Sequence, residues 1–452
     1  MSDRMRRATG GNETLRAGVG RRQLLLGSAV TAAGLAAPSI VRAQARVIQF
    51  WGTQRAPEQR EAYEKIFASF SRAHPGFTVN YDLVTEETIL PRLSAALAAR
   101  TPPDLISHIP APFAIQLNDE NLVEPMDDVV RAVGADDFNP NSMDLFRDPR
   151  RGHILAVCIV NGTTPGNMWV RKDLLAEANL QLPRTWDEML NVSRRLTRRG
   201  VFGTIFATGK NSMGDTQFLQ TVWQAGGNIV NPDMSVAFNS PQVIAALEYA
   251  KEMASFSPPE ATNYNFLDVL NGFVLGRAAT APYTGRVLIN ITRENPALAD
   301  KVTCIASPHR REGRPAFNSD FTALVIPRGS GQPEGAKLFA QHLLSKDAQI
   351  TFLHATPGHN LPDLKSVGQS EEFANDPMLK RFRAELQVML ANTAQARNLL
   401  KESAQHPINR RAGAIFGARI LSESAQDVII GGVSPRQAAA RGADKIAAIM
   451  RG

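Results

Sequence analysis

Residues that could do catalytic chemistry are scattered along this sequence. His108, His153, His309 and His359 lie far apart. The sequence has no G-x-x-x-x-G-K-[ST] phosphate loop, no strand-linked G-x-G-x-x-G, no H-E-x-x-H metal motif and no G-x-S-x-G nucleophile elbow. Any pair of carboxylates that imitates a glycosidase is better explained as surface charge. We therefore predict no catalytic residue, no metal ligand and no cofactor.

Residues that could bind a ligand are found directly after predicted strands. Ligands in open α/β sheets lie beyond the carboxyl ends of the strands, so these residues are candidates. For several of these residues a structural explanation competes with ligand binding. It is packing in the core for Trp51, a position in a solvated loop for His108, and hydrogen bonding within a turn for Asn161 and for Asn318–Asp320. Gly285 would let the backbone approach a ligand closely. The predicted ligand-binding residues of this group are Trp51, His108, Asn161, Tyr283, Gly285, Arg286, Asn318 and Asp320.

The elements that must position these residues alternate between strands and helices in the first part of the chain. Alternating apolar residues predict strands at Val47–Trp51 and Phe77–Leu83, and a helical stripe predicts a helix over Glu58–Phe70. Trp51 then either contacts a ligand at the end of its strand or packs beneath that helix. A further helix at Ile89–Ala99 and a strand at Leu105–Ser107 complete the pattern. It is typical of βαβ units and a mostly parallel sheet.

The rest of the chain is helix-rich with intervening strands. Thr185-Trp186-Asp187-Glu188 has the spacing of a capping box and begins a helix that runs to Gly200. Ser240-Pro241 begins another helix. Asn318–Asp320 is expected in a turn before a strand. The remaining predicted elements are a short helix around Asn271–Phe273, strands at Ala278–Pro282, Val302–Ala306 and Ala323–Pro327, and helices from Pro333 onward.

The first 45 residues have the features of an export signal. They hold seven arginines, two acidic residues and an apolar, Gly/Ala-rich run from Leu24 to Ala37. Arg21-Arg22 favours the twin-arginine route, but Gly20 stands where Ser or Thr is expected, so the Sec route stays open. Ala43-Gln44-Ala45 fits a signal-peptidase site that cleaves after Ala45. Without this leader the formal charge falls from +7 to +2, which removes the support for nucleic-acid binding. We expect a soluble exported protein.

The two cysteines, Cys158 and Cys304, each lie in an apolar, strand-like run. In an oxidising compartment they pair, or each is a small buried hydrophobe. Folding before export by the twin-arginine route favours free thiols.

Several short blocks of sequence occur in an order and spacing found in one known family. They are Phe50-Trp51-Gly52, His74–Phe77, Pro102–Leu105, Leu122–Asp128, Val170–Leu175, Pro183–Glu188, Asn271–Phe273, Gly276–Ala279 and Leu343–Lys346. In these blocks the chain resembles the periplasmic solute-binding proteins of ABC importers, in the branch that includes maltose-binding protein. The resemblance implies a two-lobed α/β periplasmic binding protein fold (type II), with a ligand cleft between lobes joined by hinge strands. It places lobe 1 at residues 46–157 with 307–357, and lobe 2 at 160–304 with 361–452.

The resemblance also implies site residues that the local pattern does not. Family members often present an aromatic side chain near Trp223, for which helix packing is the alternative. His359 and Asn360 fall in the family's last crossing loop, whereas Phe416 aligns too loosely to be included. The implied partners are a small-molecule solute and the ABC permease in the inner membrane. The implied chain is a monomer that closes about its hinge on the solute.

The resemblance and the residue types together favour a carbohydrate as the solute. The apolar face of a sugar stacks on aromatic rings, while its hydroxyls need amides and carboxylates. The chain has only four Trp and five Tyr, whereas His108, Arg286 and His359 are candidate cleft residues. This balance keeps open an anionic solute, such as a sugar acid or a glycerol phosphate ester. A secreted carbohydrate-active enzyme is the alternative of another class.

Overall fold

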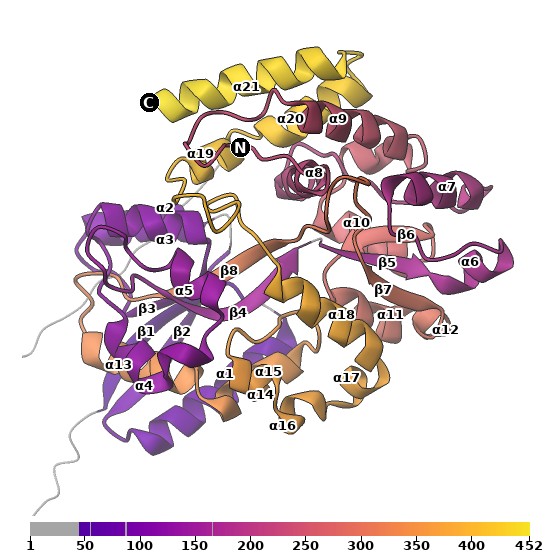
Figure 1. Ribbon diagram of the computed structural model, residues 1–452. Helices are drawn as coiled ribbons and strands as arrows, with labels where there is room; N and C mark the ends of the chain where they lie inside the picture. Colours follow the sequence, from indigo (N-terminus) through magenta and orange to yellow (C-terminus); the bar gives the residue numbers. More distant parts are fainter. Residues whose placement is uncertain (1–44, 55, 86–87, 165) are drawn as a thin grey trace, which may run out of the picture. The chain divides into compact units, whose positions relative to one another are not determined.

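The structure, a computed structural model, describes residues 45–452 apart from 55, 86–87 and 165. The predicted export signal, except for Ala45, lies outside the described residues. The strands form two separate sheets, and helices pack around both (Figure 1). No helix of the described part of the chain is both long and apolar enough to cross a membrane.

The first sheet has five strands in the order β2-β1-β3-β8-β4. Its strands are β1 (Arg46–Gly52), β2 (Phe77–Leu83), β3 (Leu105–Ile109), β4 (Val157–Thr164) and β8 (Asn318–Val325). β1 pairs in parallel with β2 and β3, but β8 runs antiparallel to both β3 and β4. The prediction of a mostly parallel sheet is therefore right only for the first three strands. It is wrong for the others because the chain returns through β8, whose partners are remote in sequence.

Neighbouring residues of β1 face opposite sides of this sheet. Phe50 packs edge-on against Tyr63 of α1 (Pro57–Ala73), with ring centroids 5.6 Å apart. Trp51 lies on the other face, where the guanidinium of Arg92 from α2 (Ile89–Ala98) covers its ring at 4.2 Å. Of the two alternatives for Trp51, packing beneath the Glu58–Phe70 helix is thus wrong, because strand side chains alternate and Phe50 takes that position.

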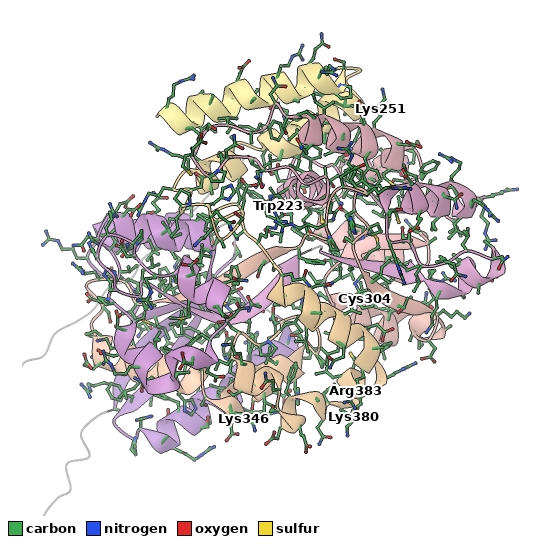
Figure 2. All side chains as sticks on the ribbon, viewed as in Figure 1. Trp223, Lys251, Cys304, Lys346, Lys380 and Arg383 are labelled. Carbon is green, nitrogen blue, oxygen red and sulfur yellow. The ribbon has the colours of Figure 1, made fainter. Side chains whose placement is uncertain are left out.

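The second sheet has three antiparallel strands in the order β6-β5-β7. They are β5 (Asn167–Arg171), β6 (Thr280–Tyr283) and β7 (Val302–Ala306). Trp169 of β5 is fully buried, and its indole N–H donates to the carbonyl oxygens of Tyr283 and Thr284 at 3.2 and 3.0 Å. Cys304 of β7 and Cys158 of β4 are free, buried thiols, which agrees with the alternative that the sequence favoured. Figure 2 shows Cys304 inside and Lys251, Lys346 and Lys380 projecting outward.

Helices account for most of the remaining chain. Those near the first sheet also include α3 (Ala111–Asp119), α4 (Asp127–Val133), α5 (Pro140–Leu145), α13 (Pro333–Leu343) and α14 (Lys346–Ala355). The central helices are α6 (Lys172–Glu177), α7 (Trp186–Leu196), α8 (Ser212–Gln224), α9 (Pro241–Ala254), α10 (Phe266–Val274), α11 (Arg286–Glu294) and α12 (Pro296–Ala299). The C-terminal ones are α15 (Lys365–Gly368), α16 (Glu371–Ala374), α17 (Pro377–Arg381), α18 (Arg383–Ala394), α19 (Ala412–Gly417), α20 (Ile420–Ile429) and α21 (Pro435–Arg451). In Figure 1, α20 and α21 lie along α9, in agreement with their many mutual contacts.

Local signals predicted most element boundaries within a few residues. The capping box at Thr185 is present, with Glu188 reaching back to the backbone, although α7 ends at Leu196 rather than at Gly200. The expected turn at Asn318–Asp320 is wrong, because these residues are the first three of β8. They pair with residues 162–164 of β4, a partner that no local signal reveals.

A buried polar group joins the segments by which the chain passes between the two sheets. Asn161 of β4 exchanges two backbone hydrogen bonds of 2.8 Å with Leu361. Its side-chain amide donates to Asp363 at 2.6 Å and accepts from Ser319 of β8 at 3.2 Å. Ser142 of α5 donates to the other oxygen of Asp363 at 2.7 Å. One amide and one carboxyl group therefore fix β4, β8, α5 and the 361–363 segment together.

This group predicts a pH dependence of stability. Burial raises the pKa of Asp363 to about 7, while hydrogen bonds from Ser142 and Asn161 oppose the shift. The folded state then holds a proton that the unfolded chain releases near pH 4, so the free energy of unfolding falls as pH rises from about 4 to about 7. We expect Asp363→Asn to reduce this fall, measured by urea unfolding at about pH 5 and pH 8. Asp136→Asn, at an exposed position, should keep the wild-type fall, and equal behaviour of the two variants would contradict the assignment.

Candidate functional site

One cavity of this structure has a volume of about 420 Å³. Sites for small ligands commonly have volumes of about 300–1,000 Å³. Its wall combines α5, the chain around the start of β8, and an irregular segment that follows α18. The lining residues are Asn141, Asp144, Leu145, Arg314, Pro315, Phe321, Gln395, Ala396, Arg397, Asn398, Lys401, Ser403, Ala404 and Gln405.

Backbone pairing with β8 fixes the irregular segment. Arg397 donates its backbone N–H to the carbonyl of Phe317 and accepts from the N–H of Ser319, both at 2.8 Å. The side-chain amide of Asn398 donates to the carbonyl of Ser319 at 2.8 Å and accepts from the N–H of Leu400 at 3.0 Å. Residues 397 and 398 are therefore held like a short strand beside β8, and Arg397 is presented to the cavity.

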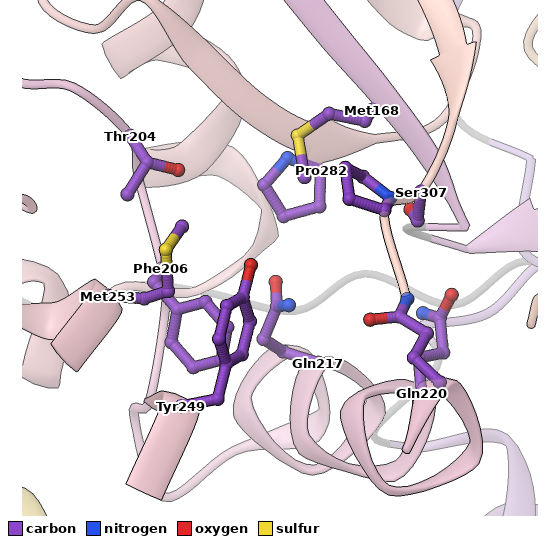
Figure 3. Close-up of a pocket in the computed structure, with 11 residues that line it drawn as sticks. Met168, Thr204, Phe206, Gln217, Gln220, Tyr249, Met253, Pro282 and Ser307 are labelled. Atoms are coloured by element: carbon purple, nitrogen blue, oxygen red, sulfur yellow. The ribbon is translucent and has the colours of Figure 1, made fainter. Parts of the chain in front are cut away.

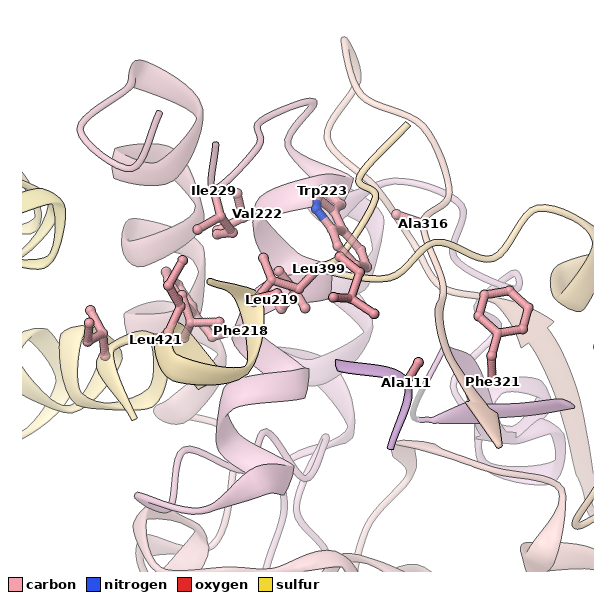
Figure 4. Close-up of a cluster of buried hydrophobic side chains, with 14 of the residues drawn as sticks. Ala111, Phe218, Leu219, Val222, Trp223, Ile229, Ala316, Phe321, Leu399 and Leu421 are labelled. Atoms are coloured by element: carbon pink, nitrogen blue, oxygen red, sulfur yellow. The ribbon is translucent and has the colours of Figure 1, made fainter. Parts of the chain in front are cut away.

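A buried carboxylate anchors this wall from behind. Glu402 accepts hydrogen bonds from the indole of Trp223 at 2.7 Å and from the backbone N–H groups of Ile229 and Val230, each at 2.9 Å. Burial raises its pKa to about 7, while these donors and Arg397 oppose the shift. Figure 4 shows the Trp223 ring among Leu219, Val222 and Leu399. The carboxylate thus ties the 395–405 segment to α8 and to the loop that follows it.

Arg397 lies between this anchor and the cavity. Its guanidinium stands 5.7 Å from the centre of the Trp223 ring, within the range of a cation–π interaction, and donates to the carbonyl of Glu402 at 3.4 Å. Burial, and then the nearby charge of Arg314, lowers the pKa of Arg397 to about 10. The side chain therefore remains a cation at neutral pH.

Of the other cationic groups of the wall, one is in an ion pair and one is in none among the described residues. Lys401 pairs with Asp144 of α5, which joins two walls of the cavity. Arg314 is exposed and lies in the irregular segment that precedes β8. The amides of Asn141, Gln395 and Gln405 add neutral donors and acceptors, and the Phe321 ring supplies an apolar surface. Such a lining suits a small polar solute with one apolar face.

A second, smaller cavity lies between α8, α9 and the ends of β6 and β7 (Figure 3). Gln217 and Thr204 point into it, and the side-chain oxygens Oε1 and Oγ1 of these two residues have no hydrogen-bond partner in the described structure. Its volume of about 10 Å³ is enough for roughly one water molecule. It is too small for a sugar in this conformation.

Three residues proposed from the sequence are buried and occupied by other contacts. Trp51 is 7% exposed and covered by Arg92. Trp223 has no exposed surface and is bound to Glu402, and Asn161 is buried in the group around Asp363. In this conformation none of the three offers a free face to a solute.

A second set of predicted residues comes together around the last crossing loop. Burial, and then the charge of His359, lowers the pKa of His108 to about 3. Burial, and then the charge of Arg286, lowers the pKa of His359 to about 4, so both imidazoles are neutral at pH 7. His108 Nε2, His359 Nδ1 and Asn360 Nδ2 are buried without a hydrogen-bond partner among the described residues. This group is polar, and its hydrogen-bonding capacity is incompletely used.

The last four predicted residues lie in or next to strands β6 and β8. Gly285 packs so tightly that an added Cβ would lie 1.9 Å from the carbonyl oxygen of Gly358, so its close approach is to the crossing loop. Tyr283 is 5% exposed, and burial raises its pKa to about 12 although Arg286 opposes the shift. Asn318 and Asp320 pair in β8 with Thr164 and Gly162.

The sequence analysis missed the residues that line the larger cavity. Arg397 and Lys401 lie in a connection of 17 residues between α18 and α19, from Gln395 to Arg411. A connection of this length inside an ordered domain is uncommon and often functional, which is the signal that could have identified it. Phe321 stands one position beyond the predicted Asp320, so the prediction located the strand but not the cavity.

Comparison with known proteins identifies the family. Residues 56–350 match the family model described as bacterial extracellular solute-binding protein. The chain belongs to this family. The resemblance drawn from the sequence is thereby confirmed.

Individual relatives are distant. The chain is 22% identical over 393 residues to YcjN of Escherichia coli (strain K12), which has a provisional name as an ABC transporter periplasmic-binding protein; the match covers 85% of this chain and 88% of the relative. A solute-binding protein from Thermotoga lettingae bound with α-D-tagatose has a TM-score of 0.75 at 22% identity, covering 90% of this chain and all of that one. The maltose-bound T. maritima MalE3 has a TM-score of 0.73 at 20% identity, covering 88% and 99%. These likenesses confirm the two-lobed α/β periplasmic binding protein fold.

The Glu402 anchor of this solute-binding protein leads to a stability prediction. Trp223→Phe keeps an aromatic ring but removes the N–H that donates to the buried carboxylate. Hydrogen bonds to charged groups contribute about 1.5–3 kcal/mol, so we expect a loss of that order in the free energy of unfolding, measured in urea. Trp186→Phe is the control, because the Trp186 indole N–H has no hydrogen-bond partner in the described structure and its ring stacks on Tyr249 at 4.1 Å. Equal losses in the two variants would contradict this role of Glu402.

Proposed function

We propose that this protein is the substrate-binding component of an ABC transporter, and that it captures a carbohydrate in the periplasm and delivers it to the membrane permease. Family membership supports the binding role, and the name of the E. coli relative supports the transporter and the compartment. The chain would act as a monomer, exported by the predicted signal.

The ligands of structural neighbours support a carbohydrate. The proteins with the same fold include complexes with α-D-tagatose, maltose, ribitol and laminaribiose. All four are polyhydroxylated, and polar groups around an apolar face recognise such molecules. These neighbours are at most 22% identical to this chain, so their ligands indicate a class of solute rather than one compound.

The observation that carries the proposal is the 420 Å³ cavity beside the crossing strands. It has room for a small saccharide, and Phe321, Asn141 and Gln395 provide an apolar surface and amide groups. A micromolar solute needs about 8 kcal/mol of binding free energy, which several hydrogen bonds and one apolar contact in this cavity can provide.

The lobes expected from the sequence fit this proposal. With lobe 1 at 46–157 and 307–357, and lobe 2 at 160–304 and 361–452, the cavity wall takes residues from both. Hinge motion about β4, β8 and the 361–363 segment would then open and close the site. We keep His108, Arg286, His359 and Asn360 in the proposal as a second polar surface that meets the solute on closure.

A saccharide panel tests the function directly. We expect at least one saccharide to raise the melting temperature by a few degrees, because a ligand at about 100 times its Kd stabilises the folded state by about 2.7 kcal/mol. Product analysis of the same mixtures should find the saccharide unchanged. Turnover would favour the carbohydrate-active enzyme, and the absence of any stabilising saccharide would refute the proposed solute class.

A substitution that fills the cavity tests the location of the site. Asn141 is exposed on α5, and its side chain has no described hydrogen bond. We expect Asn141→Trp to abolish saccharide binding by occupying the cavity while leaving the melting temperature of the free protein nearly unchanged. Asn141→Ala, which keeps the space open, should weaken binding by less than about tenfold. Unimpaired binding in the Trp variant, measured by calorimetry, would place the site elsewhere.

A further inference from the structure

The wall of the 420 Å³ cavity carries more positive than negative charge. Arg314, Arg397 and Lys401 line it together with a single acidic residue, Asp144. Lys401 and Asp144 neutralise each other as an ion pair. No ion pair among the described residues includes Arg314 or Arg397. Two guanidinium groups on one wall are therefore left without a carboxylate partner.

The nearest carboxylate behind the wall cannot serve as that partner. The oxygens of Glu402 already accept hydrogen bonds from Trp223, Ile229 and Val230. Arg397 donates instead to the backbone carbonyl of Glu402, at a long 3.4 Å. The charge of Glu402 offsets part of the cost of burying Arg397, but among the described residues most donors of the guanidinium fork have no acceptor.

The backbone of Arg397 is also held in place, and its side chain lies near an aromatic ring. The guanidinium stands 5.7 Å from the centre of the Trp223 ring, and the pairing of residue 397 with β8 fixes its backbone. An arginine with a fixed backbone and a partly restrained side chain loses less conformational entropy when it binds, and its fork matches the two oxygens of a carboxylate or phosphate. Arg314, on the exposed side of the same cavity, adds a second charge that lowers the pKa of Arg397.

We propose that the solute is an anionic saccharide, a sugar acid or a sugar phosphate, whose oxyanion binds between Arg314 and Arg397. This inference rests on the proposed capture function and adds the chemical class of its ligand. The polyol part of the solute would lie against Asn141, Gln395 and the ring of Phe321. The oxyanion would supply the counter-charge that the described protein groups do not.

Matched ligand pairs test the inference on the purified protein. Calorimetric titrations would compare D-galacturonate and D-glucuronate with D-galactose and D-glucose, and hexose 6-phosphates with the same parents. We expect at least one acid or phosphate to bind at least tenfold more tightly than its neutral parent, with an affinity that falls as salt is raised. Preference for the carboxylates over the phosphates, or the reverse, then identifies which oxyanion is used.

Substitutions assign the preference to the two arginines. We expect Arg314→Gln and Arg397→Gln each to weaken binding of the anion by about 10- to 100-fold, the usual range for a lost charge-assisted hydrogen bond. Arg397→Lys should recover part of the loss, since it keeps the charge but not the fork. Arg311→Gln is the matched control, because Arg311 is exposed three residues before Arg314 and faces Asp187 at 3.9 Å, outside the cavity.

Each outcome decides between the two proposals. If Arg314→Gln behaves like Arg311→Gln, or if neutral sugars bind as tightly as their anionic counterparts, the inference is overturned while carbohydrate capture stands. If no saccharide of either kind binds, carbohydrate capture itself fails. Because Arg397→Gln also removes the contact with Trp223, its melting temperature is measured as well, and Arg314→Gln remains decisive if that variant unfolds.

Discussion

The buried amide of Asn161 is the interaction on which the site depends. Through it, β4 is joined to Asp363 at 2.6 Å and to Ser319 of β8 at 3.2 Å, and Asp363 in turn holds Ser142 of α5. α5 and β8 are two of the walls of the 420 Å³ cavity. Removing one partner would leave buried polar groups unsatisfied, at a cost of about 1–3 kcal/mol each, and would release both walls at once.

The third wall depends on a second buried carboxyl group. Glu402 fixes the 395–405 segment to α8 through Trp223 and to the following loop through two backbone donors. Burial raises the pKa of both Asp363 and Glu402 to about 7. The hydrogen-bond donors around each group oppose this shift and stabilise its charged form. The two buried acids thus anchor the walls of the cavity, whereas arginines line it. The acids lie where backbone and side-chain hydrogen-bond donors surround them, and the net charge of the sequence does not reveal this arrangement.

Local signals predicted the fold better than the site. β2 and β7 begin and end where apolar alternation places them, and the Thr185 capping box starts α7, because these features depend on residues close in sequence. β8 starts earlier than predicted because its first residues pair with β4, far away along the chain. Arg314 and Arg397 are 83 positions apart in segments without helical or strand periodicity, so only the tertiary structure brings them to one wall.

The positions of the four tryptophans explain why charged and polar groups would have to bind the solute. Trp51 is covered by Arg92, Trp169 donates to two backbone carbonyls, Trp186 stacks on Tyr249, and Trp223 binds Glu402. Each is at most 7% exposed, so none has a free face on which a pyranose could stack. Phe321, itself 3% exposed, offers only a small apolar surface. Without large aromatic platforms, a solute in this cavity must gain its binding free energy from hydrogen bonds, and those to guanidinium groups are the strongest that the wall provides.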